Sequence, residues 1–324
     1  MTATELDAAD ITDPGLRESY RCCRTLNARH GKTFFLATRL LAPDQRPAVH
    51  ALYGFARRAD DILDEFDPAL TAADRAARLA VLARQFRSGD SDGDPVLAAV
   101  LHTAVRYNIP GELFDAFLAS MRMDLTVTDY PDRNALDRYI YGSAEVIGLQ
   151  LLPILGTVDN EGQAAPYAAA LGKAFQLTNF LRDIDEDLAR GRVYLPVDEL
   201  AAHGVDRDLL MWCRREQRID SRVRDALAAQ HALTREIYDY ARDGIELLAP
   251  RSRPCVATAL RLYSEILDRI EDSAFEVFGQ RARVGRLRRA YVGATGLAHA
   301  QWARRRWPRR PTDEGHARGI SEPL

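Results

Sequence analysis

The chain has 324 residues, of which 47% are hydrophobic and 28% charged, and this composition is typical of a soluble globular protein. Its 44 basic and 47 acidic residues leave a net charge of −3, which gives no general basicity for binding nucleic acid. The four cysteines form neither a CxxC pair nor a disulfide framework, so they indicate a reducing compartment.

The start of the chain, MTATELDAADITDPG, is acidic and polar, and it lacks the basic and apolar regions of an export signal. The longest apolar run, Ala144 to Val158, is 15 residues long and contains Glu145 and Pro153, so it is too short and too polar to cross a bilayer. These features predict a cytoplasmic protein without an integral membrane anchor.

The periodicity of the chain predicts an all-α protein. Apolar residues recur at spacings of three and four almost throughout, as in YSEILDRIEDSAFEVF, and alternating strand patterns are absent. Short segments rich in Gly, Pro, Asp and Asn mark the helix breaks, at residues 67–70, 88–95, 108–112, 130–134, 159–162 and 250–254. None is long enough to be a flexible linker, so we expect one helical domain over residues 1–303.

The segment YGFARRADDILDE, Tyr53 to Glu65, carries a polar stripe. At about 100° per residue, Tyr53, Arg57, Asp60 and Asp64 fall within an arc of roughly 60° on one helix. A pair of carboxylates spaced four residues apart therefore follows an arginine and a tyrosine on the same face.

A second polar stripe lies in QLTNFLRDIDED, Gln176 to Asp187. If this segment is one helix, Gln176, Asn179, Asp183 and Asp187 fall within an arc of roughly 80°. Like charges four residues apart destabilise an isolated helix by about 0.2–0.5 kcal/mol per pair. The second stripe therefore predicts a nearby cation, which could be an arginine, a solvent counterion or a metal.

Two segments depart from the helical pattern. Residues 189–204, ARGRVYLPVDELAAHG, are expected to form an ordered loop near the end of the second stripe. Residues 304–324 begin basic and lack apolar periodicity, so we expect a disordered tail. Contact with acidic lipid headgroups is an alternative for its arginines, which are Arg304, Arg305, Arg306, Arg309 and Arg310.

Two carboxylate stripes facing each other across a cavity would suit the magnesium-assisted departure of diphosphate. Mg²⁺ takes oxygen ligands and commonly joins one or two carboxylates to substrate phosphates. An opposing interpretation is that the aspartates are solvated or pair with Arg57, Arg58 and Arg182. The seven histidines show no ligand spacing, so no zinc site is expected.

At these residues the sequence resembles the squalene/phytoene synthase family, the head-to-head prenyl transferases. HGKTFFLATRLLAPDQRPAVHALYGFARRADDILDE is similar to the family's first signature, and LGKAFQLTNFLRDIDEDLARGRVYLPVDEL to its second. The similarity extends over roughly residues 30–289 and is strongest to the phytoene-forming bacterial members. It implies the all-α isoprenoid synthase fold around a central cavity.

The resemblance also implies roles for individual residues. Mg²⁺, or alternatively Mn²⁺, would be held by Asp60, Asp64, Asn179, Asp183 and Asp187, and the four aspartates would be catalytic. Contacts to diphosphate or to the first isoprenoid carbons would come from His30, Lys32, Thr33, Tyr53, Arg57, Gln176, Asn179, Arg182, Tyr263 and Arg281. The family's third signature is altered here, because Ala144 to Gly148 read AEVIG and place Glu145 where a small residue is usual.

The activity implied is the condensation of two geranylgeranyl diphosphates to phytoene, without NADPH. A squalene-type C30 synthase acting on farnesyl diphosphate is the alternative within the family, and a non-catalytic helical interaction protein is the alternative outside it. A head-to-tail prenyl transferase would carry DDxxD without the preceding Gln and Asn. We expect a monomer with peripheral contact to the inner membrane face and no nucleic-acid partner.

Overall fold

The structure is a computed structural model that describes residues 3–64, 70–279 and 281–307. Over these ranges the chain forms helices and no β-strand, and only two isolated β-bridges occur, so the all-α prediction is confirmed. The helices are α1 (Ala3–Ala8), α2 (Pro14–His30), α3 (Lys32–Thr38), α4 (Arg46–Asp64), α5 (Ala72–Ser88), α6 (Pro95–Arg106), α7 (Gly111–Met123), α8 (Arg133–Ile140), the π-helix η1 (Tyr141–Glu145), α9 (Val146–Leu155), α10 (Glu161–Arg182), α11 (Ile184–Ala189), α12 (Val197–Ala202), α13 (Arg207–Glu216), α14 (Ser221–Asp243), the 3₁₀-helix η2 (Gly244–Leu247), α15 (Arg253–Asp272) and α16 (Arg286–Arg306).

Polar side chains at the predicted breaks cap the helices that follow. Asp94 accepts hydrogen bonds from the first backbone amides of α6, Asp132 from that of Ala135 in α8, and Asn160 from that of Gly162 in α10. Such caps satisfy backbone donors that have no partner within the helix. The described breaks therefore lie where the sequence predicts them, and the break at 67–70 lies outside the described residues except for Leu70.

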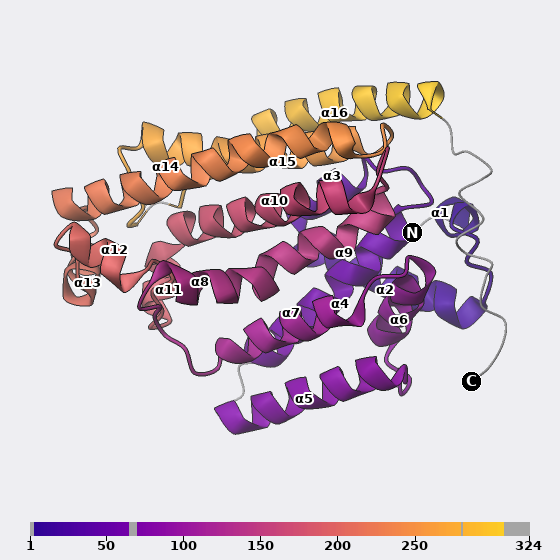
Figure 1. Cartoon of the computed structure of the whole chain (residues 1–324), viewed down its shortest axis with the longest axis horizontal. Helices are drawn as coiled ribbons and strands as arrows, with labels where there is room; N and C mark the ends of the chain where they lie inside the picture. Colours follow the sequence, from indigo (N-terminus) through magenta and orange to yellow (C-terminus); the bar gives the residue numbers. More distant parts are fainter. Residues whose placement is uncertain (1–2, 65–69, 280, 308–324) are drawn as a thin grey trace.

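Helix α10 runs through the middle of the molecule (Figure 1). It packs against α14 and α15 on one side and against η1 and α9 on the other. Helices α4 and α7 lie beyond α9, and α5 forms the opposite edge from α16 in this view. The helices around α10 thus surround the space in which the candidate site lies.

Two glycines let η1 and α9 lie directly against α10. A Cβ atom on Gly172 would come within 2.4 Å of the carbonyl oxygen of Ala144, and one on Gly148 within 2.2 Å of that of Ala168. Neither backbone oxygen can give way as a flexible side chain could. The close approach of these elements therefore requires glycine at both positions.

The second stripe does not form the continuous helix that was expected. Helix α10 ends at Arg182, Asp183 has φ −105° and ψ 11°, and α11 begins at Ile184. The first turn of α11 then carries Asp185, Glu186 and Asp187. Carboxylates are favoured at a helix N-terminus and disfavoured as neighbours within a helix, so the break relieves part of their repulsion.

The two non-periodic segments are also partly helical. Residues 190–196 form the expected loop, which the backbone N–H of Val193 ties to the carbonyl of Thr128 at 2.8 Å, and α12 follows it. Helix α16 continues through Arg304–Arg306, three residues past the expected domain boundary. Residues 308–324 of the expected tail lie outside the described residues. Taken over its described residues, the chain contains no helix with both the length and the apolar character needed to cross a bilayer.

Candidate active site

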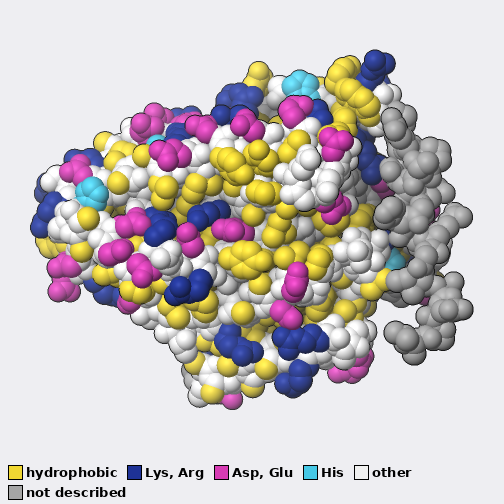
Figure 2. Space-filling view, viewed as in Figure 1, with side chains coloured by type: hydrophobic (Ala, Val, Ile, Leu, Met, Phe, Trp, Pro, Cys, Tyr) yellow, Lys and Arg dark blue, Asp and Glu magenta, His cyan; other side chains and the backbone are white. Residues whose placement is uncertain are grey.

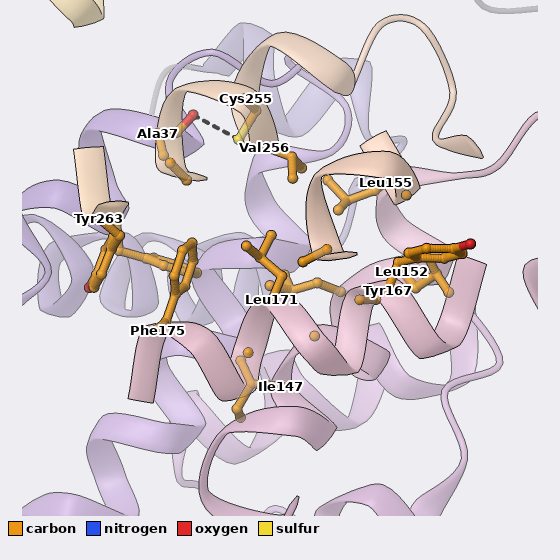
Figure 3. Close-up of a pocket in the computed structure, with 18 of the residues that line it drawn as sticks. Ala37, Ile147, Leu152, Leu155, Tyr167, Leu171, Phe175, Cys255, Val256 and Tyr263 are labelled. Atoms are coloured by element: carbon orange, nitrogen blue, oxygen red, sulfur yellow. Dashed lines mark hydrogen bonds between the residues drawn. The ribbon is translucent and has the colours of Figure 1, made fainter. Parts of the chain in front are cut away.

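An apolar cavity of about 270 Å³ lies between α3, η1, α9, α10, η2 and α15. Figure 3 shows Tyr263 and Phe175 at one end of it and Leu155 and Tyr167 at the other, with Leu171 between them. Its few polar lining residues include Thr33, Ser143 and Gln176. The cavity can therefore take an elongated hydrocarbon chain and exclude water from it.

The residues of the first stripe lie on α4, and Arg57 pairs with an aspartate outside the stripe. The guanidinium of Arg57 pairs with the carboxylate of Asp61 at 2.5 Å. Its Nε atom is buried and makes no hydrogen bond to a described residue. Arg58 pairs with Asp94 at 3.2 Å. The side chain of Asp64 lies outside the described residues.

Tyr53, the first residue of the first stripe, lies against the HGKT segment, residues 30–33, and the start of α3. Its ring packs on that of Phe34 with centroids 5.4 Å apart, and burial raises the pKa of its phenol. A Cβ atom on Gly31 would come within 2.8 Å of the same ring. Glycine at this position therefore allows the junction of α2 and α3 to lie against Tyr53.

The three predicted residues around Gly31 point to different places. Thr33 lines the cavity, whereas His30 is exposed at the end of α2. Lys32 is exposed and lines a separate pocket between α3 and α16, together with Thr33 and Arg289. The structure thus brings Thr33 to the apolar cavity, whereas His30 and Lys32 do not line it.

The second cluster centres on Asp183, whose carboxylate is held by two arginines. Arg182 donates from Nε and Nη2 at 2.7 and 2.6 Å, and Arg281 donates from the same two atoms at 2.8 Å each. Arg281 also contacts Glu186 at 3.2 Å. The predicted pairing of Arg182 with an aspartate is present, and Arg281 joins it from a distant part of the chain.

Near Asp183, the side-chain oxygen atoms of Asn179 and Asp187 are available to bind a cation. The Oδ1 atom of Asn179 is buried and has no hydrogen-bond partner among the described residues. Burial, with a smaller effect of the Asp183 charge, raises the pKa of the Asp187 carboxyl to about 7. A buried amide oxygen and a half-buried carboxylate without an ion-pair partner among the described residues are the kind of ligands that Mg²⁺ binds.

Tyr263 connects the second cluster to the cavity and to Tyr53. Its ring stacks on Phe175 with centroids 4.2 Å apart, and burial raises the pKa of its phenol, which Arg182 and Asp183 also influence. The pKa of Tyr53 is raised chiefly by burial, and Tyr263 is among the smaller influences. The phenol of Tyr53 on α4 and the Asp183 cluster after α10 therefore both lie within electrostatic range of Tyr263, which lines one end of the cavity.

No three Asp, Glu, His or Cys side chains among the described residues gather closely enough to form a ready-made metal site, and Asp64 is not among those side chains. The ligand atoms available at the second cluster, which belong to Asn179 and Asp187, are all oxygen atoms. This donor set matches a hard divalent cation and does not match zinc.

Glu145 does not line the cavity, although it replaces a small residue of the third signature. Ser143, Ala144, Ile147 and Gly148 line it instead. Glu145 faces a separate hollow with Lys173, which pairs with Asp137 at 2.8 Å, and burial raises the pKa of the Glu145 carboxyl. The substitution therefore leaves the cavity wall apolar.

A polar cluster around Asp124 was not predicted from the sequence. Tyr139 and Tyr194 donate hydrogen bonds to its carboxylate at 2.9 and 3.1 Å, and Arg192 donates to its backbone carbonyl at 2.7 Å. The backbone N–H of Arg192 in turn donates to the carbonyl of Asp187 at 2.8 Å. This cluster holds the loop after α11 and hence the backbone of Asp187. The only signal for it in the sequence is the density of tyrosines, which predicts packing alone.

Comparison with known proteins agrees with this geometry. The family model described as squalene/phytoene synthase matches residues 27–288. The chain is 36% identical to a phytoene synthase of Arthrospira platensis over 279 residues, which are 82% of this chain and 88% of the relative. It is also 36% identical to a 15-cis-phytoene synthase of Synechococcus elongatus over 282 residues, covering 83% of this chain and 89% of the relative.

Among solved structures, a dehydrosqualene synthase bound to a ligand superposes with a TM-score of 0.77 at 25% identity, over 89% of this chain and 98% of the other. The isoprenoid synthase fold expected from the sequence is thereby confirmed. On the family model, these relatives and the shared architecture, the chain belongs to the squalene/phytoene synthase family.

Proposed function

We propose that this protein is a prenyl transferase that condenses two geranylgeranyl diphosphates head to head and forms phytoene. The observation that carries the proposal is the apolar cavity at whose wall Phe34 packs on Tyr53 and Phe175 packs on Tyr263, with the Asp183 cluster close to Tyr263. An allylic diphosphate needs these two environments side by side, one for its hydrocarbon chain and one for its charged head.

The diphosphate end would be held by basic and polar residues. Arg57, Arg182 and Arg281 present guanidinium groups suited to bidentate contacts with phosphate oxygens. The remaining contacts would come from the junction of α2 and α3, through His30, Lys32 and Thr33, and from Tyr53, Gln176, Asn179 and Tyr263. Each is proposed as a substrate-binding residue.

The proposed divalent cation is Mg²⁺, with Mn²⁺ as a substitute. Its ligands would be Asp60, Asp64, Asn179, Asp183 and Asp187. When bound, such a cation neutralises the negative charge that develops on the departing diphosphate. In the described state, Arg182 and Arg281 occupy the oxygens of Asp183, so Arg281 would have to release this carboxylate before it could serve as a ligand.

The cavity walls would protect the carbon chemistry. Loss of diphosphate from one substrate leaves an allylic cation, which the double bond of the second substrate attacks with loss of a proton to give the cyclopropyl intermediate prephytoene diphosphate. Loss of its diphosphate, ring opening and loss of another proton then give phytoene. The aromatic faces of Phe34, Tyr53 and Phe175 can stabilise a nearby cation by about 0.5–2 kcal/mol each.

A C30 synthase is the second candidate, because a dehydrosqualene synthase shares the fold over most of the chain. Identity is higher to the phytoene synthases, at 36% against 25%, which favours the C40 product. We further propose that the protein acts in the cytoplasm as a monomer that contacts membranes peripherally.

The test is to incubate purified protein and Mg²⁺ with geranylgeranyl or farnesyl diphosphate, each with and without NADPH, and to identify the extracted hydrocarbon by mass. A C40 hydrocarbon formed without NADPH is the expected result. A C30 hydrocarbon would replace the proposal with the second candidate, and the absence of any product would support a non-catalytic protein.

A further inference from the structure

Helix α16 presents large apolar side chains to solvent along one face. Leu287 is 89% exposed, Tyr291 58% and Trp302 61%. At about 100° per residue these three residues, with Ala298 and Arg305, fall within an arc of roughly 60°. We refer to this stripe, Leu287, Tyr291, Ala298, Trp302 and Arg305, as the outer face of α16.

The opposite side of the same helix is built to pack on the body of the protein. Val292, Ala300 and Ala303 are buried there. Gly296 lies so close to α15 that an added Cβ atom would meet the hydroxyl oxygen of Thr258 at 2.4 Å. Helix α16 therefore packs on the rest of the protein mainly through small residues, and its outer face takes no part in this packing.

The formal charges of α16 are all positive. Its sequence contains six arginines and no acidic residue. Arg288 pairs with Glu265, and Arg304 donates to the carbonyl of Leu40. Arg305 and Arg306 have no ion-pair partner among the described residues, and they lie beside Trp302 and Trp307, whose rings are in edge-to-face contact. Figure 2 shows hydrophobic and Lys or Arg side chains adjoining at the upper right, over the C-terminal end of α16.

We propose that the outer face of α16 docks on a lipid bilayer that contains anionic headgroups. Tryptophan and tyrosine favour the membrane interface, and a helix with apolar side chains on one stripe and arginines near its ends can lie in that interface. The inference rests on the proposed membrane contact and assigns it to a surface, and it does not depend on which hydrocarbon the protein makes.

A second copy of the chain fits this surface less well. Two copies joined face to face by a two-fold axis would bring the same residues together. The arginines of one α16 would then meet those of the other without any acidic residue of α16 between them. An anionic bilayer offers both the opposite charge and an apolar interior for Leu287, Tyr291 and Trp302.

Flotation of the full chain with vesicles tests the proposal. Phosphatidylcholine vesicles with about one third phosphatidylglycerol should carry the protein, whereas pure phosphatidylcholine vesicles should carry much less. Trp302→Ser should lower the partition coefficient by about tenfold, and the double variant Arg305→Glu/Arg306→Glu by at least as much. Circular dichroism and thermal unfolding would confirm that each variant folds.

Matched controls lie on α13. Trp212→Ser removes another exposed tryptophan and Arg215→Glu reverses another exposed arginine, and both should bind vesicles like the unchanged protein. Equal binding to both vesicle types, no binding to either, or an unchanged partition of Trp302→Ser would each overturn the proposal. Product formation measured in parallel without vesicles separates this outcome from a failure of the proposed reaction.

Discussion

Arg281 donates two hydrogen bonds of 2.8 Å to the carboxylate of Asp183, which lies 98 residues earlier in the chain. This contact ties the segment before α16 to the break between α10 and α11. With Arg182 it fills the acceptor sites of Asp183 with charge-assisted hydrogen bonds. The same guanidinium groups would face a diphosphate bound at this end of the cavity.

Replacing Arg281 with lysine should keep the charge and lose the two-pronged geometry. We expect kcat/KM to fall about 10- to 100-fold, which corresponds to the roughly 1.5–3 kcal/mol of a charge-assisted hydrogen bond. Steady-state kinetics with geranylgeranyl diphosphate would measure it. Arg283→Lys, at an exposed arginine without an ion pair in the described part of the chain, is the control and should leave kcat/KM unchanged. An unaltered kcat/KM in Arg281→Lys would contradict the proposed role.

His50 should make the protein sensitive to acid. Its Nδ1 contacts the side-chain amide of Asn27 at 2.9 Å, and burial lowers the pKa of its imidazole to about 3. An unfolded histidine titrates near 6.5, so the stability contributed by neutral His50 is present above pH 6.5 and is lost as pH falls toward 3. We expect this loss to reach about 1–3 kcal/mol by roughly pH 4.

Urea unfolding at several pH values would test this expectation. His50→Gln should flatten the fall in the free energy of unfolding between pH 7 and pH 4, whereas His299→Gln, at an exposed position on α16, should follow the unchanged protein. Parallel curves for the unchanged protein and His50→Gln would show that the buried imidazole does not cause the effect.

Asp124→Asn should loosen the loop that follows α11. The substitution removes the charge that accepts hydrogen bonds from Tyr139 and Tyr194, and it places an amide N–H₂ among donors. Leaving buried hydroxyl groups poorly paired costs about 1–3 kcal/mol. Chemical denaturation should report this loss, and hydrogen exchange should rise in residues 190–196. Tyr194→Phe, which removes one donor and leaves the charge, should show a smaller effect; equal stability of all three proteins would refute the importance of the cluster.

Ala164→Leu should narrow the end of the cavity away from Gln176. Ala164 is buried and lines the cavity, and α10 leads from it through Ala168 and Leu171 to Gln176. Because a C20 chain reaches further than a C15 chain, turnover of geranylgeranyl diphosphate should fall more than that of farnesyl diphosphate. Overpacking costs about 1–3 kcal/mol of stability, and the resulting loss of folded enzyme would lower both rates by the same factor. The ratio of the two rates, measured in one preparation, is therefore independent of that loss. A ratio equal to that of the unchanged protein would show that the chain lies elsewhere.

The helices and their breaks could be predicted from the sequence because their causes are local. Asp94, Asp132 and Asn160 cap helices within three residues of their own positions. The polar stripe of α4 also lies on one uninterrupted helix, as predicted from the spacing of Tyr53 and Asp60.

Other features depend on contacts that a local pattern does not contain. The break at Asp183 reflects the preference of Asp185, Glu186 and Asp187 for a helix N-terminus, and the sequence allowed a continuous helix equally well. Arg57 had several aspartates within reach and pairs with Asp61.

The environment of Glu145 is similarly non-local. The π-helical turn at 141–145 shifts the positions of side chains, so Glu145 faces away from the cavity that Ala144 lines. The Asp124 cluster joins residues up to 70 positions apart. Its members could be placed together only by the tertiary fold.

The most direct test of the central claim compares Asp183→Asn with Asp185→Asn. Asp183 is held by Arg182 and Arg281 close to Tyr263, which lines the cavity, whereas Asp185 pairs with Arg214 at 3.4 Å. With geranylgeranyl diphosphate and Mg²⁺, and without NADPH, we expect Asp185→Asn to release diphosphate and form the C40 hydrocarbon. Folded Asp183→Asn should form neither product. Undiminished C40 formation by Asp183→Asn would contradict the proposed site, and its absence from the unchanged protein would contradict the proposed reaction.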